Sequence, residues 1–177
     1  MSHNITELIS SSEISVRVKE LAVQITRDYA GEELTLICAL KGGVVFFADL
    51  MREIDLPVRL EFVKVSSYGE SSESSGKLQM DFPIKTDLTG KHVLIVEDIV
   101  DMGYTARWLR EYFAGLLPKS VKLCALLDKP ERRKVEACAD YVGFTIPDEF
   151  VVGYGLDYAQ QHRNLPFIGK LKIEVHP

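Results

Sequence analysis

Apolar positions along the chain follow two patterns. Short apolar runs, many of them rich in Val, Ile and Leu, predict strands, and those without polar alternation are typical of strands buried on both faces. Apolar residues three or four positions apart, separated by charged ones, predict amphipathic helices. The predicted helices cover residues 13–30, 44–54 and a stretch that includes 106–113. The predicted strands are residues 34–40, 58–66, 78–84, 93–96, 121–127, 141–146 and 167–175.

Strands that alternate with helices indicate βαβ units and a parallel sheet, with a ligand at the carboxyl edge of the strands. The predicted fold class is therefore α/β, a Rossmann-like parallel sheet flanked by helices. The chain after Pro147 is less regular, and we expect it to form a small flap beside that edge. Because no repeat or composition break divides the chain, we expect residues 1–177 to form one domain.

Composition narrows the function classes. With 46% hydrophobic and 27% charged residues the chain is typical of a soluble globular protein. A net charge of −5 and the lack of a broad basic stripe weigh against nucleic acid as a partner. No apolar run approaches the ~20 residues of a membrane span. The N-terminus lacks the basic-then-apolar pattern of a signal peptide, so we expect no membrane association.

The three cysteines, Cys38, Cys124 and Cys138, show no metal-type spacing. Two of them lie in apolar strand-like runs, which predicts free thiols in the core. Free thiols favour a reducing compartment, and we expect the cytoplasm.

The stretch 93–105 carries the clearest chemistry. Glu97 and Asp98 follow an apolar run where a strand is expected to end, and Asp101, Gly103 and Thr105 precede a helical pattern. A strand, a tight turn and a helix N-terminus present free backbone N–H groups that suit a phosphate. Two carboxylates beside a phosphate make sense when hydroxyls and a divalent metal are also bound. The stretch therefore predicts a sugar-phosphate site.

Two further segments join the same picture. Residues 41–43, Lys-Gly-Gly, connect a predicted strand to a predicted helix and again present backbone amides at a helix start. Residues 67–77 are rich in serine and glycine, so they can bury little. This segment is equally consistent with a solvent linker and with a lid over the site.

Together these segments resemble a known family. Residues 93–105 resemble the 5-phosphoribosyl-1-pyrophosphate (PRPP) motif of type I phosphoribosyltransferases. Residues 40–43, 67–68 and 150–158, with Lys129 and Arg163, resemble the branch that uses 6-oxopurines. The resemblance implies the type I phosphoribosyltransferase fold, with a small hood built from both ends of the chain. It also implies transfer of the phosphoribosyl group from PRPP to N9 of hypoxanthine, and of guanine, to give IMP (GMP) and pyrophosphate in purine salvage, with Mg²⁺ as cofactor.

The resemblance assigns roles around PRPP. Glu97 and Asp98 would meet the ribose hydroxyls and a Mg²⁺, and Asp101 would face N7 of the purine as the catalytic acid–base group. Met102 stands where the family has Thr or Ser, so one hydroxyl contact is lost and weaker PRPP binding is expected. The 5′-phosphate would be held by Asp101, Met102, Gly103, Tyr104 and Thr105.

Roles for pyrophosphate, purine and lid follow from the same resemblance. A cis peptide is implied between Leu40 and Lys41, and the segment 67–77 becomes a lid. Phe150 taken alone is better explained as a core residue; only the register makes it a stacking ring. The implied pyrophosphate contacts are Lys41, Gly42 and Arg163; the lid residues Ser67 and Tyr68; the purine contacts Lys129, Phe150, Val151 and Asp157, the last also near a second Mg²⁺.

Two matters stay open from sequence. A regulator that keeps the fold as a nucleotide-sensing or RNA-binding module is the competing hypothesis, although it would need a basic face. A P-loop NTPase is excluded because no Gly-x4-Gly-Lys-Ser/Thr occurs.

The family implies a homodimer or homotetramer, and the apolar content of residues 44–51 is compatible with an interface.

Overall fold

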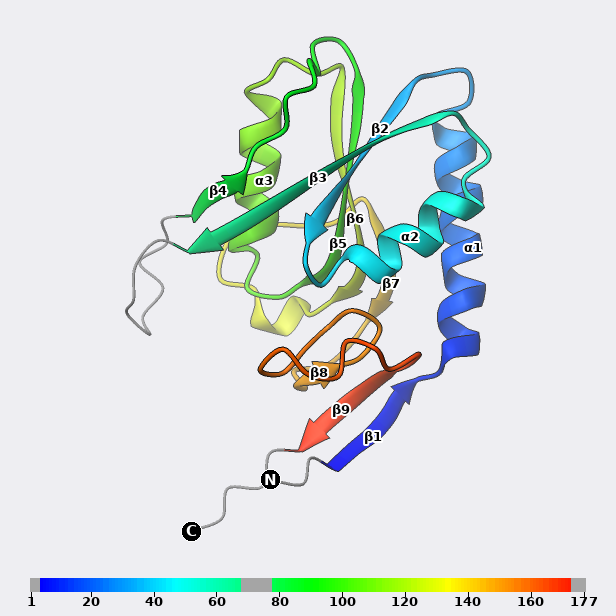
Figure 1. The fold of residues 1–177 in the computed structure, drawn as a ribbon, viewed down its shortest axis with the longest axis vertical. Helices are drawn as coiled ribbons and strands as arrows, with labels where there is room; N and C mark the ends of the chain where they lie inside the picture. The colour runs from blue at the N-terminus through cyan, green and yellow to red at the C-terminus, as the bar shows by residue number, and fades with distance from the viewer. Residues whose placement is uncertain (1–3, 68–77, 173–177) are drawn as a thin grey trace.

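A six-stranded sheet forms the centre of the protein in a computed structural model that describes residues 4–67 and 78–172. Its order is β4-β3-β2-β5-β6-β7, and only β4 runs antiparallel to its neighbour, β3. The strands are β2 (Leu34–Leu40), β3 (Val58–Ser67), β4 (Leu78–Phe82), β5 (His92–Val100), β6 (Ser120–Asp128) and β7 (Tyr141–Thr145). The arrangement confirms the predicted α/β class, with all carboxyl ends of the parallel strands at one edge (Figure 1).

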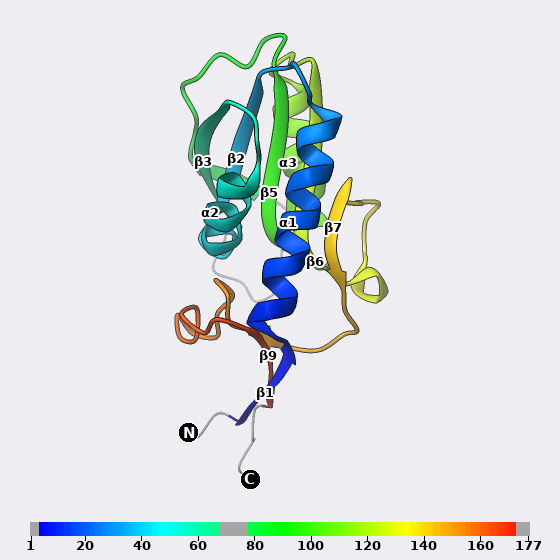
Figure 2. The same ribbon diagram turned by 90° about the vertical axis from the view of Figure 1, so that its right-hand side faces the viewer.

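The helices cover both faces of this sheet. The helices α1 (Ser11–Asp28) and α2 (Val44–Glu53) lie on one face, and α3 (Tyr104–Ala114) lies on the other (Figure 2). Each matches a predicted helix. The start of α1 is set by a capping box, in which the Ser10 side chain accepts from the Glu13 backbone and the Glu13 carboxylate accepts from the Ser10 backbone.

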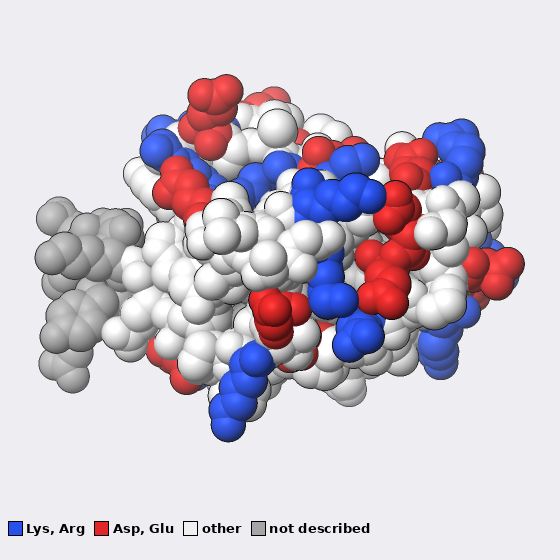
Figure 3. All heavy atoms as spheres, turned by 90° about the horizontal axis from the view of Figure 1, so that it is seen from above, with Lys and Arg blue, Asp and Glu red and all other residues white. Residues whose placement is uncertain are grey.

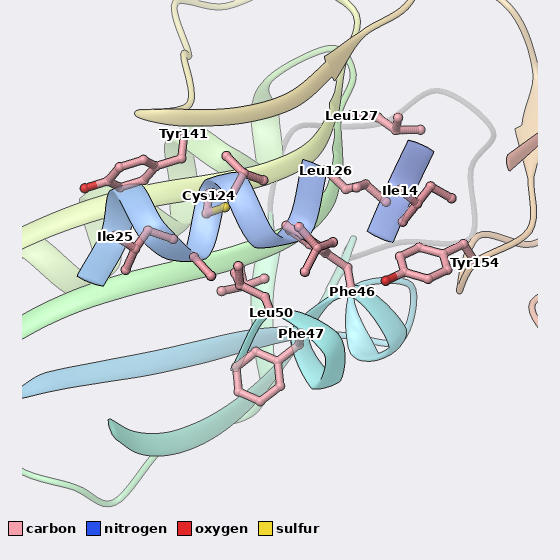
Figure 4. Close-up of a cluster of buried hydrophobic side chains, with 14 of the residues drawn as sticks. Ile14, Ile25, Phe46, Phe47, Leu50, Cys124, Leu126, Leu127, Tyr141 and Tyr154 are labelled. Atoms are coloured by element: carbon pink, nitrogen blue, oxygen red, sulfur yellow. The ribbon is translucent and has the colours of Figure 1, made fainter. Parts of the chain in front are cut away.

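Alternation along the central strands separates two cores. Side chains at 36, 38, 94, 96 and 124 pack under α1 and α2, whereas those at 37, 95 and 123 pack under α3. Figure 4 shows side chains of the first core from α1, α2 and β6, and among them Phe47 of α2 points toward β3, where it packs against Phe62. This period of two is what a strand covered on both faces requires.

A second, three-stranded sheet lies beyond the carboxyl edge of the main one (Figures 1 and 2). Its order is β1-β9-β8, from β1 (Asn4–Ile9), β8 (Val151–Val152) and β9 (Ile168–Lys172), all antiparallel. It therefore unites the N-terminal and C-terminal segments over the edge where a ligand is expected. The sequence analysis did not predict the strand β1, because five of its six residues are exposed or only half buried and give no apolar signal.

Several boundaries differ from the prediction, and those of β5 and β9 are two examples. The expected end of a strand before Glu97 is wrong, because β5 continues to Val100 alongside β6, with Glu97 opposite Ala125 and Ile99 opposite Leu127. The strand expected at 167–175 begins one residue later, at Ile168, and is described as far as Lys172. Residues 68–77, which hold most of the predicted lid, lie outside the described residues, as do 1–3 and 173–177.

The cysteines match the prediction of free thiols, and two of them are buried. Burial, reinforced by the charges of Glu97 and Asp98, raises the pKa of the Cys38 thiol to about 12, and burial also raises the pKa of Cys124. The thiolate is the reactive form. A thiol reagent at pH 8 should therefore modify Cys138 rapidly in the native protein and all three cysteines after unfolding. Fast modification of more than one thiol in the native state would contradict this expectation.

Charges of both signs are mixed on the face seen in Figure 3. Ion pairs join loops at the amino edge of the sheet, such as Lys119 with Glu32 at 2.7 Å and Lys91 with Glu33 at 3.2 Å. An extended positive surface is absent from this face. Within the described residues, no helix combines the length and apolar character needed to cross a membrane.

Candidate active site

Two cavities lie side by side at the carboxyl edge of the main sheet. The first is lined by the loop that links β5 to α3 and has a volume of about 250 Å³. The second, also about 250 Å³, lies between the end of β6 and the segment that leads into β8. Ile99 and Asp101 line both cavities. A ligand that fills both would therefore pass Asp101 at the junction.

The first cavity has the geometry of an anion site. Gly103, with φ of +94°, turns the chain into α3, and its lack of a side chain leaves the first amides of the helix without a side-chain cap. A Cβ here would meet Arg133, Ala137 and the carbonyl of Val135. Thr105 lies in the first turn of α3 and lines the cavity. The predicted phosphate loop, residues 101–105, is thus assembled as a unit.

Glu97 and Asp98 stand next to this loop; Glu97 is buried and Asp98 is partly exposed. Burial, and then the charge of Asp98, raises the pKa of the Glu97 carboxyl well above its usual range. Burial raises the pKa of Asp98 to about 6, although the backbone amide of Ile99 donates to its Oδ1 at 2.9 Å. Glu97 Oε1 is screened from solvent and finds no hydrogen-bond partner among the described residues.

These carboxylates suit a hard cation. Unpartnered, desolvated carboxylate oxygen is what Mg²⁺ can bind, and Mg²⁺ takes few protein ligands and completes its shell with water and substrate oxygens. Within residues 4–67 and 78–172, no cluster of three or more metal-ligating side chains occurs. The residues therefore fit a metal shared with substrate and not an all-protein cage.

The turn after β2 is packed against this pair. The Leu40–Lys41 peptide is cis, as the resemblance implied. A Cβ at Gly42 would collide with the Asp98 carboxylate, and a Cβ at Gly155 would collide with the Gly42 carbonyl. Glycine at both positions allows the chain to run backbone against backbone here. The α2 N-terminus at Gly43 has no side-chain cap, although the Val44 amide donates to the Lys41 carbonyl at 3.2 Å.

Two cations meet beside this turn. Arg163 pairs with Asp157 at 2.7 Å and donates to the Gly155 carbonyl at 2.8 Å. Gln160 Oε1 accepts from Lys41 Nζ at 3.4 Å and from Arg163 Nη2 at 3.3 Å. The predicted pyrophosphate residues are therefore close together, with Gln160, which the sequence analysis missed, between them.

The second cavity holds the residues expected to meet a purine. Lys129 is 5% exposed, and its Nζ donates to the Glu149 carbonyl at 2.5 Å. Phe150 is 48% exposed, which rules out the core interpretation of this ring. The rings of Phe150 and Tyr158 are arranged edge to face, with 5.6 Å between their centroids. Val151 and Asp157 also line the cavity.

Two arginines that sequence analysis missed reach the same loop. Arg132 pairs with Asp101 at 2.8 Å and donates to Asp148 at 3.1 Å. Arg133 Nη1 donates to the Asp101 carbonyl at 2.5 Å and pairs with Asp128. For Arg132, the sequence signal was its spacing of three residues from Lys129. In the 3₁₀ helix η1 (Pro130–Arg132), residues three apart lie on the same side.

The predicted lid is not part of this geometry. The backbone of Ser67 ends β3, whereas its side chain and Tyr68 lie outside the described residues. The orientation of β3 carries the chain toward the carboxyl edge of the sheet (Figure 1).

Comparison with known proteins identifies the family. The model of the phosphoribosyl transferase domain matches residues 4–159. The chain belongs to this family. It is 46% identical over 175 residues to the hypoxanthine phosphoribosyltransferase of Haemophilus influenzae, covering 97% of this chain and 98% of that one. It is 47% identical over 177 residues to the hypoxanthine-guanine phosphoribosyltransferase of Bacillus subtilis, covering 99% and 98%.

Solved structures agree with this assignment. A crystal structure of a hypoxanthine-guanine phosphoribosyltransferase from Bacillus anthracis has a TM-score of 0.90 and 48% identity, covering 97% of this chain and 100% of that one. The phosphoribosyl transferase match spans both cavities and ends before Arg163. The relatives extend over that arginine, because they cover nearly the whole chain.

Proposed function

We propose that this phosphoribosyl transferase moves the 5-phosphoribosyl group of PRPP to N9 of hypoxanthine and guanine, and releases pyrophosphate. Relatives with nearly complete coverage carry the names hypoxanthine and hypoxanthine-guanine phosphoribosyltransferase. The observation that carries the proposal is the position of Asp101 on both cavities. One cavity suits the phosphate of a sugar phosphate, the other a flat base, and the acid stands where the new bond would form.

On the PRPP side, amides at the start of α3 and the Thr105 hydroxyl bind the 5′-phosphate. Met102 offers no hydroxyl at this loop, so we expect PRPP to bind more weakly than with Thr or Ser there. Glu97 and Asp98 accept from the ribose 2′- and 3′-hydroxyls. The amides near Gly42, together with Lys41 and Arg163, receive the charge of the departing pyrophosphate.

On the purine side, Lys129 donates to the exocyclic O6, and Phe150 stacks on the ring. The backbone of Val151 meets the ring edge. Lys129 is fixed by the Glu149 carbonyl, so its remaining protons are directed by the protein and not by solvent. A base with a 6-amino group offers no acceptor for this lysine. Preference for 6-oxopurines over adenine follows.

The chemistry is displacement at C1′ through an oxocarbenium-like transition state. The ring nitrogens N9 and N7 share one proton, and the Asp101 carboxylate takes or holds it at N7 while N9 bonds to C1′. Positioned proton transfer of this kind contributes ~10²–10⁴-fold to rate. The proposed lid, Ser67 and Tyr68 within 67–77, would exclude water that otherwise captures the oxocarbenium.

Mg²⁺ is the proposed cofactor, held by Glu97 and Asp98, with Asp157 near a second ion. When bound, it neutralises charge on pyrophosphate. IMP formation should stop in EDTA and return with added Mg²⁺. Asp98→Asn should raise the half-saturating Mg²⁺ concentration at least about tenfold. Full turnover in EDTA would exclude a metal, and unchanged Mg²⁺ dependence in Asp98→Asn would exclude this ligand.

The proposal takes residues 1–177 as one catalytic domain, with the sheet β1-β9-β8 as its hood. We propose that it acts in the cytoplasm as a homodimer or homotetramer. Sedimentation equilibrium tests the assembly, and a monomer at micromolar concentration would exclude it. Fractionation of the source cells tests the compartment.

The decisive experiment is a side-by-side assay of the purified protein with PRPP, Mg²⁺ and each of four bases. We expect IMP from hypoxanthine, GMP from guanine, and kcat/KM for adenine lower by ~10³-fold or more, because a buried donor without an acceptor is costly. The value of kcat/KM for xanthine, which also carries a 6-oxo group, measures how the site discriminates between substituents at C2. No nucleotide product from any base would exclude the enzyme and favour the nucleotide-sensing hypothesis.

A further inference from the structure

One ion-paired arginine in the purine cavity has no role in the proposed chemistry. Arg132 extends from the 3₁₀ helix η1, on the same side as Lys129, because residues three apart eclipse in this helix. Its Nε lies 2.8 Å from Asp101 Oδ1, and its Nη1 donates to Asp148 Oδ1 at 3.1 Å. The guanidinium therefore bridges the β5–α3 loop and the segment before β8.

The pair distinguishes the two oxygens of Asp101. Oδ1 is screened from solvent and accepts no hydrogen bond within the described residues, so Arg132 Nε meets it as an ion pair only. The Asp101 side chain as a whole is 36% exposed, and this exposure comes from its other atoms, which include Oδ2. Arg132 therefore lies against one oxygen of the carboxylate, Oδ1.

We propose that Arg132 is a positioning residue that holds Asp101 in the orientation needed at purine N7, an inference that rests on the proposed function. A carboxylate on a loop can rotate about χ1 and χ2, and misplacement of a catalytic group by about 1 Å can cost ~10²-fold in rate. Anchorage to Asp148 fixes the guanidinium from its other end. Arg133 does not replace it, because it donates to the Asp101 carbonyl.

The experiment is a double-mutant cycle in kcat for IMP formation. Arg132→Gln should lower kcat about tenfold, with KM for PRPP nearly unchanged, since a partly exposed ion pair is worth little but orientation is sensitive. Arg132→Lys should restore part of the rate. In an Asp101→Asn background the same Arg132→Gln change should have no further effect. Arg59→Gln, which removes an exposed arginine near Glu33 at the opposite edge, is the matched control.

Three results would overturn the inference. The first is an equal rate loss from Arg132→Gln in both backgrounds, and the second is a rise in KM for the base with kcat unchanged. The third is wild-type rate in Arg132→Gln. If the wild-type protein makes no nucleotide, the proposed function fails and this inference fails with it. If the wild-type protein is active but the effects of the two substitutions are additive, only this inference is rejected.

Discussion

Replacing Asp101 with Asn should lower kcat for IMP formation by ~10²–10⁴-fold, the usual contribution of a positioned acid–base group. Asparagine keeps the shape of the side chain and a carbonyl oxygen, but it cannot take a proton at neutral pH. Because the proposed contacts of the loop to the 5′-phosphate are backbone amides, KM for PRPP should change little. A fall in kcat without a rise in KM identifies an interaction made in the transition state.

Single-turnover kinetics would separate this chemical step from product release. Asp87→Asn is a suitable control, because Asp87 is exposed in the turn before β5, where it accepts from the Thr89 backbone. That variant should keep wild-type kcat. Near-normal turnover in Asp101→Asn would remove the acid from the chemistry and leave the purine proton to solvent.

Much of the fold follows from apolar periodicity. The strand 34–40 and the helix from 44 were predicted with nearly their observed bounds, because both are apolar and end at glycine or a polar residue. Periodicity failed for the small sheet. The strands β1 and β8 both pair with β9, and the β1–β9 pairing joins opposite ends of the chain, which no local pattern encodes.

The candidate site divides in the same way. Residues 97–105 are contiguous, so one stretch of sequence was enough to predict that they line a common cavity. Arg132 and Gln160 were missed, because each contacts a partner 31 or more positions away, Asp101 for the first and Lys41 for the second. Phe150 was ambiguous until its 48% exposure ruled out a core role.

The second large effect is expected where two loops meet without side chains between them. Gly155 has φ of +101°, and a Cβ there would collide with the Gly42 carbonyl. Gly155→Ala should therefore strain its own backbone and push away the turn that packs against Asp98. We expect a loss of ~2–4 kcal/mol in unfolding free energy, from αL strain plus displaced backbone. KM for PRPP should rise about tenfold or more, because the pyrophosphate amides move.

Gly31→Ala separates the two causes. Gly31 also has a positive φ, +79°, but a Cβ there would meet nothing within 4 Å. Its loss of stability should be only ~1–2 kcal/mol, the cost of a left-handed residue with a side chain, with KM for PRPP unchanged. Urea unfolding and initial-rate kinetics on both variants measure the difference. If Gly155→Ala matched Gly31→Ala in stability and kept its KM, the 155 and 42 backbones would not be in obligatory contact. The position of the turn at residues 41–43 would then depend on its contacts with Asp98 and the start of α2, and not on Gly155.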